Sequence, residues 1–438
     1  MSSSELINYI VKPGGSLQGE MIVPGDKSIS HRSIMFGALA EGTTKVSGFL
    51  EGEDSLATLK AFKDMGVNIQ GPDDGTVIIQ GVGMHGLKKP DNDLDLGNSG
   101  TSMRLMSGLL SAQSFDSTLT GDKSLSSRPM KRVTDPLAAM GAVIDADDGK
   151  APLCVKGNQK LKAIHYDMPI ASAQVKSCLL LAGLYADGIT SVTEPGITRD
   201  HTERMLKAFA YPVNVDGNKV SVEGGHTMIA CDLDIPADIS SAAFFLVGGC
   251  IAENSNLLLK NVGVNPTRTG VIDILRLMGG DITLENERMF GGEPVADIRA
   301  RSSQLKGINI PTELVPLAID EFPVLFVAAS CAMGQTVLTD AKELKVKESD
   351  RIQAMADGLV VLGINAVATD DGIIIQGGEI LSGTVESYDD HRISMAFAIA
   401  GLRAKGEIII NNCANVATSF PGFIELASKA GLHISIKA

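Results

Sequence analysis

The sequence predicts an α/β protein built from six copies of one folding unit, arranged as two domains of three copies each. Six small-residue-rich apolar runs recur at intervals of about 70 residues, and a period this long indicates a duplicated unit. Each run is followed by a β-rich segment, an amphipathic helical pattern and a pair of β-rich arms. The runs occupy residues 30–35, 98–105, 172–177, 239–245, 320–325 and 390–395.

Each run opens with polar or charged residues and then turns apolar on most faces, as the start of a buried helix does. The amphipathic helices that follow are expected at 54–65, 130–140, 201–210, 267–278, 349–362 and 422–430. Five of them are followed by glycine, as a helix C-cap is, whereas the third is followed by Ala210-Tyr211. Asp-Gly dipeptides predict hairpin turns at 74–75, 148–149, 216–217 and 371–372.

The two chain ends are expected to share a domain. The sixth copy stops without its closing strand, and an orphan β-rich segment at 7–11 precedes the first copy. We expect this segment to complete the sixth copy. The first domain then spans 26–234, and the second combines 1–25 with 235–438.

Composition excludes several classes of function. The chain has 38 Lys and Arg against 52 Asp and Glu, a net charge of −14, which disfavours nucleic acid or an anionic membrane as the main partner. The six cysteines form no Cys-x-x-Cys pair and are expected to be free thiols. No signal-peptide pattern opens the chain, and its apolar runs are shorter than the ~20 residues of a membrane helix. We therefore expect a cytoplasmic location.

Basic residues gather where helices are expected to begin. Lys27, Ser28 and Arg32 share one turn-to-helix segment that lacks the glycine spacing of a P-loop. A Gly-rich turn leads to Gly100, and Arg128 stands before a proline suited to a first helical turn. Each element alone is commonly a cap or a turn, but recurrence at equivalent positions favours a phosphate or carboxylate site.

Carboxylates enter with copies five and six. Asp320 lies at an expected helix start within an apolar run, a setting that suits proton transfer. The segment 345–351 alternates in charge before a helix, and alone it is typical of a solvated salt-bridge face. Copy six opens with Asp389-Asp390-His391-Arg392.

These segments together resemble the 5-enolpyruvylshikimate-3-phosphate synthase family over essentially the whole chain. The densest matches are 25–32, 96–104, 127–129, 172–176, 198–204, 320–323, 345–351 and 390–395. The resemblance implies two domains, each of three βαβαββ repeats, with helix N-termini facing an interdomain cleft. It also implies transfer of the enolpyruvyl group of phosphoenolpyruvate to the 5-hydroxyl of shikimate 3-phosphate, by addition and elimination, in a monomer without metal or organic cofactor.

The resemblance also assigns residues, each by its match to a family motif. For proton transfer it implies Asp320 as acceptor at the 5-hydroxyl and Glu348 at the methylene carbon, with Lys27 beside both substrates. For shikimate 3-phosphate it implies Lys27, Ser28, Arg32, Ser172, Gln174, Arg199, Asp320 and Lys347. For phosphoenolpyruvate, and for the family's inhibitor glyphosate, it implies Lys27, Gly100, Arg128, Gln174, Arg351 and Arg392.

The chain departs from relatives in this family at three places. Ala173 stands where many have a second serine, Glu343 stands where some have an asparagine, and 417–421 lacks the lysine that many carry before Phe-Pro. Two alternatives stay open at this point. One is a related enolpyruvyl transferase acting on a UDP-amino sugar, although no cysteine here has the mobile-loop setting of its reactive cysteine. The other is a non-catalytic anion-binding protein of the same fold.

Overall fold

Six central helices begin at the six repeated runs in the computed structural model, which describes residues 7–437. In five of them the side chain of the preceding residue accepts a hydrogen bond from a backbone N–H of the first turn, the exception being Glu321 before α10. The prediction of helix N-termini at the runs is therefore confirmed. The helices are α1 (Lys27–Leu39), α3 (Gly100–Leu110), α6 (Ala173–Gly183), α8 (Ile239–Ile251), α10 (Phe322–Ser330) and α12 (His391–Ala400).

The second, amphipathic helices lie close to their expected positions. They are α2 (Glu53–Asp64), α5 (Lys131–Ala139), α7 (His201–Ala208), α9 (Gly270–Leu277), α11 (Arg351–Val361) and α13 (Phe423–Ala430). One local expectation is wrong: Pro129 is not in a first helical turn. A short helix, α4 (Lys123–Ser127), forms before it because Asp122 caps Leu125 N at 2.7 Å, and Arg128 ends α4.

In five of the six copies the sheet joins a parallel pair of strands to an antiparallel neighbour. The strand orders in the first three copies are β16 (Leu233–Asp234)-β4 (Thr43–Ser47)-β6 (Thr76–Gln80)-β5 (Asn68–Asp73), β7 (Leu94–Asp95)-β8 (Ser117–Thr120)-β10 (Lys150–Val155)-β9 (Ile144–Asp147) and β11 (His165–Asp167)-β12 (Ile189–Thr193)-β14 (Lys219–Glu223)-β13 (Val213–Asp216). A small separate sheet pairs β3 (Ala40–Glu41) with β15 (Met228–Ile229).

The last three copies repeat the arrangement. Their orders are β2 (Gln18–Met21)-β17 (Asn256–Gly263)-β19 (Glu293–Arg301)-β18 (Asp281–Phe290), then β20 (Gln335–Leu338)-β22 (Ile373–Gln376)-β21 (Asn365–Ala368), and β23 (Gly383–Glu386)-β24 (Ile408–Asn411)-β1 (Asn8–Val11)-β25 (Ile434–Lys437). In copy five the parallel edge strand is reduced to a bridge between Asn309 and Val337.

The orphan strand closes the sixth copy, as expected. β1 pairs antiparallel with β24 and with β25, so that Tyr9 faces Ile410 on one side and Ile436 on the other. Copies one and four also borrow a strand from a distant part of the chain. β16 supplies the parallel edge of the first sheet, and β2 supplies that of the fourth.

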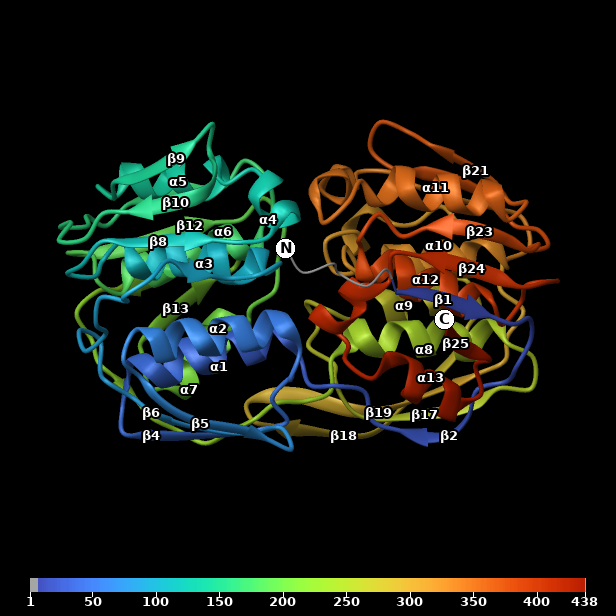
Figure 1. Ribbon diagram of the computed structural model, residues 1–438, viewed down its shortest axis with the longest axis horizontal. Coiled ribbons are helices and arrows are strands. Elements are labelled where there is room, and N and C mark those ends of the chain that lie inside the picture. Colours follow the sequence, from blue (N-terminus) through green and yellow to red (C-terminus); the bar gives the residue numbers. More distant parts are fainter. Residues whose placement is uncertain (1–6, 438) are drawn as a thin grey trace. The chain divides into compact units, whose positions relative to one another are not determined.

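The chain divides into two compact units. Unit 2 contains Gly25–Ile235 with Phe290–Gly292, and unit 1 contains the described residues up to Pro24, Pro236–Met289 and those from Glu293 onward (Figure 1). The unit ends fall beside the domain boundaries expected from the sequence; that these boundaries delimit domains stays a prediction.

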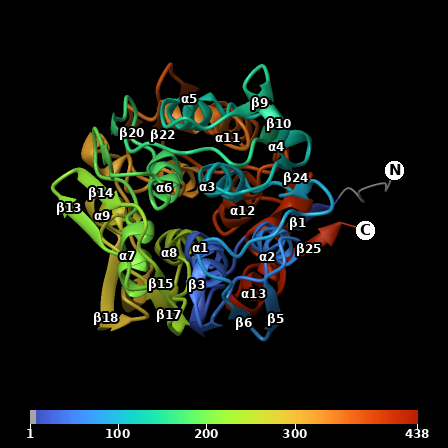
Figure 2. The ribbon, with the colours of Figure 1, turned by 90° about the vertical axis from the view of Figure 1, so that its left-hand side faces the viewer.

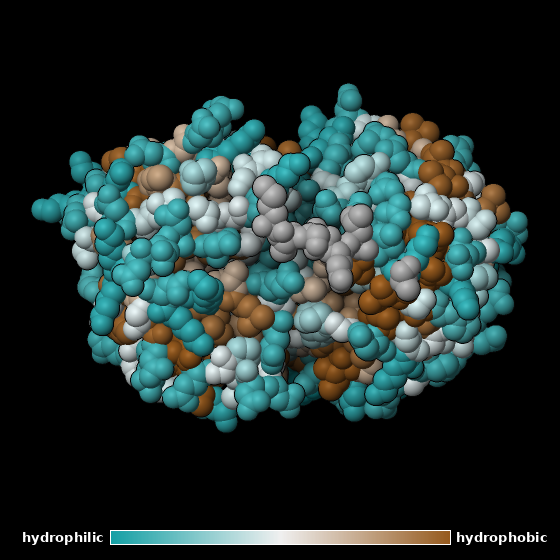
Figure 3. All heavy atoms as spheres, in the orientation of Figure 1, coloured by the Kyte–Doolittle hydropathy of each residue, from teal (hydrophilic) through white to brown (hydrophobic). Residues whose placement is uncertain are grey.

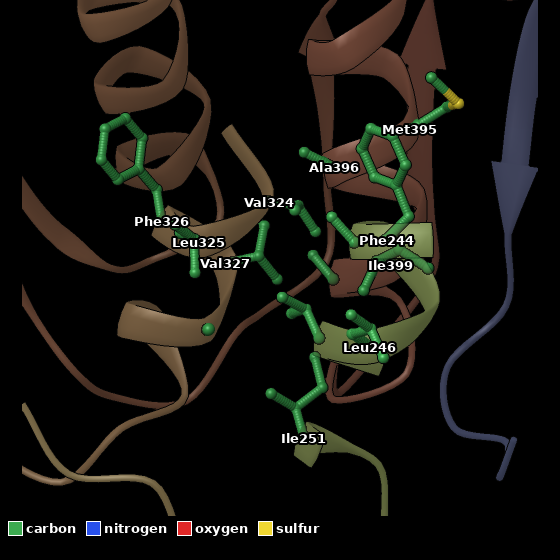
Figure 4. Close-up of a cluster of buried hydrophobic side chains, with 14 of the residues drawn as sticks. Phe244, Leu246, Ile251, Val324, Leu325, Phe326, Val327, Met395, Ala396 and Ile399 are labelled. Carbon is green, nitrogen blue, oxygen red and sulfur yellow. The ribbon is translucent and has the colours of Figure 1, made fainter. Parts of the chain in front are cut away.

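Each unit has its own aliphatic core around three buried helices. In unit 2 these are α1, α3 and α6, seen end-on in Figure 2 with sheets on the outside. In unit 1, side chains of α8, α10 and α12 meet in the core drawn in Figure 4, and every residue of α8 is buried. Hydrophilic residues cover most of each unit on the face shown in Figure 3. Within residues 7–437, no helix has the length and apolarity needed to cross a membrane.

The six amphipathic helices end in the same hydrogen-bonded turn. In five of them the second residue after the C-cap donates its N–H to the carbonyl five positions back, as Val67 does to Phe62 at 3.0 Å and Tyr211 to Leu206 at 2.8 Å. In α13 the residue directly after the C-cap, Leu432, donates in the same way to Ala427 at 3.0 Å. Five of these turns place glycine in the left-handed region, where it is unstrained. In the third copy Ala210 takes this conformation, with φ of 58°.

We predict that Ala210→Gly stabilises the protein. Relief of the left-handed strain on alanine, partly offset by the greater freedom of glycine in the unfolded chain, is expected to raise the free energy of unfolding by about 0.5–1 kcal/mol. Chemical denaturation measures the change. The matched control is Gly141→Ala (φ 96°), whose added Cβ meets no atom closer than Lys160 O at 3.5 Å and should destabilise by a similar amount. A destabilised Ala210→Gly protein would contradict the prediction.

Candidate active site

Unit 2 gathers basic residues at the N-termini of its three buried helices. Lys27 is the first residue of α1, and its Nζ lies 2.6 Å from Asp54 Oδ2 on α2, with 18% of the Lys27 side chain exposed. Ser28 follows it and is half-buried. A part-buried ammonium, paired with one carboxylate, thus lies at the N-terminus of this helix, where backbone N–H groups also favour anions.

Arg32 is fixed by three hydrogen bonds within unit 2. Its Nε donates to Thr202 Oγ1 at 2.7 Å, its Nη2 to Ser177 Oγ at 2.8 Å and its Nη1 to Ser28 O at 3.0 Å. The residue is only 3% exposed. Because its partners lie on α1, α6 and α7, the guanidinium is held in one orientation before any ligand arrives.

Two guanidinium groups lie beside Gly100, the first residue of α3. A Cβ built on Gly100 would lie 3.1 Å from Arg128 Nη1 and 3.1 Å from Arg104 Nη1. Arg128 is oriented by Asn98, whose Oδ1 accepts from Nη2 at 2.6 Å and whose backbone O accepts from Nη1 at 3.2 Å. The glycine therefore keeps open the space next to two buried cations.

Arg104, to which no motif gave a role, also belongs to this group in the structure. Its Nη1 donates to Gln174 Oε1 at 2.5 Å, and Gln174 Nε2 donates to Thr101 Oγ1 at 3.0 Å. These two contacts fix which way the Gln174 amide points. The only sequence signal was an arginine within an otherwise apolar helix.

Ser172 and Arg199 complete the expected set in unit 2. Ser172 is the N-cap of α6, and its Oγ accepts from Val175 N at 3.4 Å. Arg199 is half-buried, two residues before α7 begins. Ala173 is the first residue of α6, so this helix start carries one hydroxyl where two are common in the family that the sequence resembles.

Unit 1 brings together the expected acids and the remaining cations. Asp320 Oδ1 lies 3.4 Å from Lys347 Nζ and 3.4 Å from Arg351 Nη1, and Asp320 O accepts from Arg392 Nη1 at 2.9 Å. The Asp320 side chain is 12% exposed. The carboxylate of Asp320 therefore lies beside two cations and is open in part to solvent.

Arg351 is the buried centre of this group and is 1% exposed. Its Nε lies 2.8 Å from Asp390 Oδ2 and its Nη2 lies 2.6 Å from Glu348 Oε2. Burial opposes the charged form, but the carboxylates of Asp390, Glu348 and Asp320 outweigh it and raise the pKa of Arg351 above its ordinary value. The shortest contacts occupy Nε and Nη2, so Nη1 is the donor with the loosest protein partner.

Asp390 is a second residue that sequence analysis leaves without a role. It is fully buried, caps α12 by accepting from Arg392 N at 2.9 Å, and also accepts from Ser349 Oγ at 3.1 Å. One carboxylate thus orients the start of α12 and the start of α11. This is the arrangement needed to hold Arg351 and Arg392 in register.

The two other departures from the family pattern have local consequences in unit 1. Glu343 Oε1 lies 3.9 Å from Lys347 Nζ, so it adds a weak, part-exposed partner to that lysine. Thr418 is buried and its hydroxyl donates to Asn415 O at 2.7 Å. The segment before Phe420 contributes no cation. Among residues 7–437, no cluster of His, Cys, Asp and Glu side chains could hold a metal ion.

Helix-start cations beside carboxylates define a protein that handles anionic substrates and moves protons. Comparison with known proteins makes this specific. Residues 11–426 match the family model of EPSP synthase (3-phosphoshikimate 1-carboxyvinyltransferase). The chain belongs to this family.

Relatives and solved structures agree with the family match. Proteins named 3-phosphoshikimate 1-carboxyvinyltransferase from Alkalilimnicola ehrlichii and Methylococcus capsulatus are each 63% identical to this chain. The first match covers 98% of this chain and 97% of the relative, and the second covers 98% of each. The solved EPSP synthase from Acinetobacter baumannii is 59% identical, with a TM-score of 0.88 over 99% of this chain and 100% of that one.

His31 joins three helices of unit 2 and makes a pH-dependent contribution to stability. Burial, and then the charges of Lys27 and Arg32, lower the pKa of His31 well below its ordinary value of 6.5. Its Nδ1 lies 2.8 Å from Thr58 Oγ1 and 3.2 Å from Ser102 Oγ, which joins α1 to α2 and α3. The folded state therefore holds a neutral imidazole.

We predict that this histidine weakens the fold as the pH falls below 6.5. Above that pH it is neutral in both states, whereas below it only the unfolded chain binds the proton. The free energy of unfolding then falls by up to about 1.4 kcal/mol per pH unit. Urea unfolding between about pH 7 and 5.5 should show a shallower slope in His31→Gln, even though that variant is less stable overall. His165→Gln, at a part-exposed histidine, is the control; an equal loss of slope there would contradict the assignment.

Proposed function

We propose that this chain transfers the enolpyruvyl group of phosphoenolpyruvate to the 5-hydroxyl of shikimate 3-phosphate and releases inorganic phosphate. The observation that carries the proposal is the charged group around Asp320, in a chain 63% identical over 98% of its length to proteins named for this reaction. We further propose that the enzyme acts in the cytoplasm as a monomer.

The anionic groups of the two substrates account for the cations of both units. Each substrate carries a phosphate and a carboxylate, and oriented guanidinium groups bind such anions through paired hydrogen bonds. Shikimate 3-phosphate is assigned to one set of residues: Lys27, Ser28, Arg32, Ser172, Gln174, Arg199, Asp320 and Lys347. Phosphoenolpyruvate is assigned to another: Lys27, Gly100, Arg128, Gln174, Arg351 and Arg392.

The proposed reaction runs by addition and then elimination. Asp320 accepts the proton of the 5-hydroxyl, whose oxygen bonds to C2 of phosphoenolpyruvate while a proton is added to the methylene carbon. In the resulting tetrahedral intermediate a proton leaves the new methyl group and the C–O bond to phosphate breaks. We assign the proton at carbon to Glu348, whose Oε2 lies 2.6 Å from Arg351 Nη2, and the positive charge beside both substrates to Lys27.

We assign phosphoenolpyruvate to the loosest contact of Arg351. Its Nη1 lies 3.4 Å from Asp320, whereas Nε and Nη2 lie within 2.8 Å of their carboxylates. We propose that a substrate anion takes the Nη1 donor. Asp320 is then released from one cation at the moment when it must accept a proton.

The reaction itself is tested by incubating the purified protein with both substrates and measuring phosphate release. We predict steady release with both substrates and none when either is omitted. Folded protein that binds both substrates without releasing phosphate would support a non-catalytic anion-binding protein, and turnover with a UDP-amino sugar instead would support the related transferase.

We predict that Asp320→Asn lowers kcat by about 10²- to 10⁴-fold, the usual contribution of a general base. Shikimate 3-phosphate should still bind, because the amide keeps the size of the side chain and its cationic neighbours remain. Asp389→Asn, at an exposed carboxylate beside Asp390, is the matched control. A kcat within threefold of the starting protein, as a rough limit, would remove Asp320 from the role of base.

We predict that Gly100→Ala weakens the binding of glyphosate more than it weakens the binding of shikimate 3-phosphate. The added Cβ would lie 3.1 Å from both guanidinium groups and must displace them or the ligand. Overpacking of this kind costs about 1–3 kcal/mol, so the inhibition constant should rise roughly tenfold or more. The inhibition constant measured against phosphoenolpyruvate tests this, and an unchanged value would contradict the steric argument.

A further inference from the structure

A buried lysine in unit 2 has no part in the assignments above. Lys176, on α6, is 1% exposed, and its Nζ lies 2.8 Å from Glu194 Oε1 and 2.7 Å from Glu203 Oε1. Both glutamates are themselves 3% exposed. Removing three charged groups from water is costly, and a hydrophobic residue of similar size would serve a purely structural role at lower cost.

The two glutamates flank the segment that carries Arg199. Glu194 directly follows β12, and Glu203 lies in the first turn of α7. Lys176 therefore ties together the beginning and the end of the connection between this strand and this helix. Without the shared cation, the two carboxylates would repel each other and the connection would lose its anchor at both sides.

Glu194 also holds the residue next to Arg199. Its Oε2 accepts from Thr198 N at 3.0 Å, its Oε1 accepts from the Thr198 hydroxyl, and its backbone O accepts from Asn218 Nδ2 at 2.6 Å. A displacement of Glu194 is thus passed to the backbone at Thr198. Arg199 is the following residue, and its position moves with that backbone.

The same helix starts carry other residues assigned to shikimate 3-phosphate. Ser177, next to Lys176, donates or accepts at 2.7 Å with Thr202 Oγ1 of α7, and both hydroxyls accept from Arg32. The ion pairs of Lys176 therefore add to an α6–α7 contact that already orients one substrate cation. The second cation assigned to this substrate is Arg199, and Lys176 is connected to it through Glu194 and the backbone of Thr198.

We infer that Lys176 is a positioning residue for the binding of shikimate 3-phosphate, acting through Glu194 and Glu203 on Arg199. The inference rests on the proposed function, in which Arg199 contacts this substrate. Lys176 itself touches neither the substrate nor the reacting atoms in this account.

The test is a double-mutant cycle on the dissociation constant of shikimate 3-phosphate, measured by calorimetry with the full-length protein. We expect Lys176→Met to weaken binding by about tenfold while the KM of phosphoenolpyruvate changes less than about twofold. Lys176→Met combined with Arg199→Met should bind no more weakly than Arg199→Met alone, because both changes remove one function. Lys207→Met, at an exposed lysine of α7, is the matched control.

The outcomes separate the inference from the proposed function. If Arg199→Met binds shikimate 3-phosphate normally, the assignment of Arg199 fails and the inference fails with it. If Arg199→Met binds shikimate 3-phosphate weakly but Lys176→Met binds it normally, or if the two effects multiply in the double variant, the inference alone is wrong.

If Lys176→Met does not fold, Thr198→Val serves as a second variant, because it removes one hydrogen bond to Glu194 and leaves the ion pairs intact. Binding weakened roughly threefold supports the inference, and unchanged binding overturns it.

Discussion

The candidate site residues of both units depend on ion pairs between buried cations and carboxylates. Arg351 and Lys176 are almost fully buried, and each has carboxylate oxygens at 2.6–2.8 Å. A buried charge that lost its partner would cost several kcal/mol, on the order of 3–5, so these partners are fixed as firmly as the aliphatic core. Substrate anions then meet donors that need no reorganisation, which is the condition for strong electrostatic stabilisation in a reaction.

Duplication supplies the framework for these ion pairs. Three buried helices in each unit begin at polar positions, and a side chain caps all of them except α10. Five of the six copies carry a residue assigned to a substrate or to proton transfer. Copy four carries none. There Arg268 Nη2 lies 2.6 Å from Ser240 Oγ and 3.2 Å from Asp238 Oδ1, all within buried protein. The same position in the repeat thus serves the stability of unit 1.

Local signals predicted much of the fold and few of the contacts. Capping residues marked the helix starts, glycines marked the helix ends, and the orphan strand at 7–11 was expected in the sheet where it lies. One partner of Arg32 is Thr202, 170 residues away, and no periodicity or cap relates such positions. Arg104 and Asp390 were missed for the same reason, since their role comes from neighbours brought close only by folding.

The site residues themselves were predicted from family motifs and not from the spacing of residues along the chain. Helix-start cations could be predicted as an anion site, but which anion each one binds followed only from the resemblance. The structure adds the order of the contacts: Arg351 has one loose donor, Gly100 lies beside two guanidinium groups, and Glu194 holds Thr198, the residue before Arg199. These contacts show which donor atoms of the buried cations are held by carboxylates and which are held least tightly.

The most direct test of this account asks which phosphate leaves. Phosphorus NMR of the protein with phosphoenolpyruvate and shikimate 3-phosphate follows both phosphates at once. The account predicts that the phosphoenolpyruvate signal is replaced by inorganic phosphate, while the ester at position 3 of the shikimate ring stays intact in the product. Release of phosphate from shikimate 3-phosphate, or no change in either signal, would contradict it.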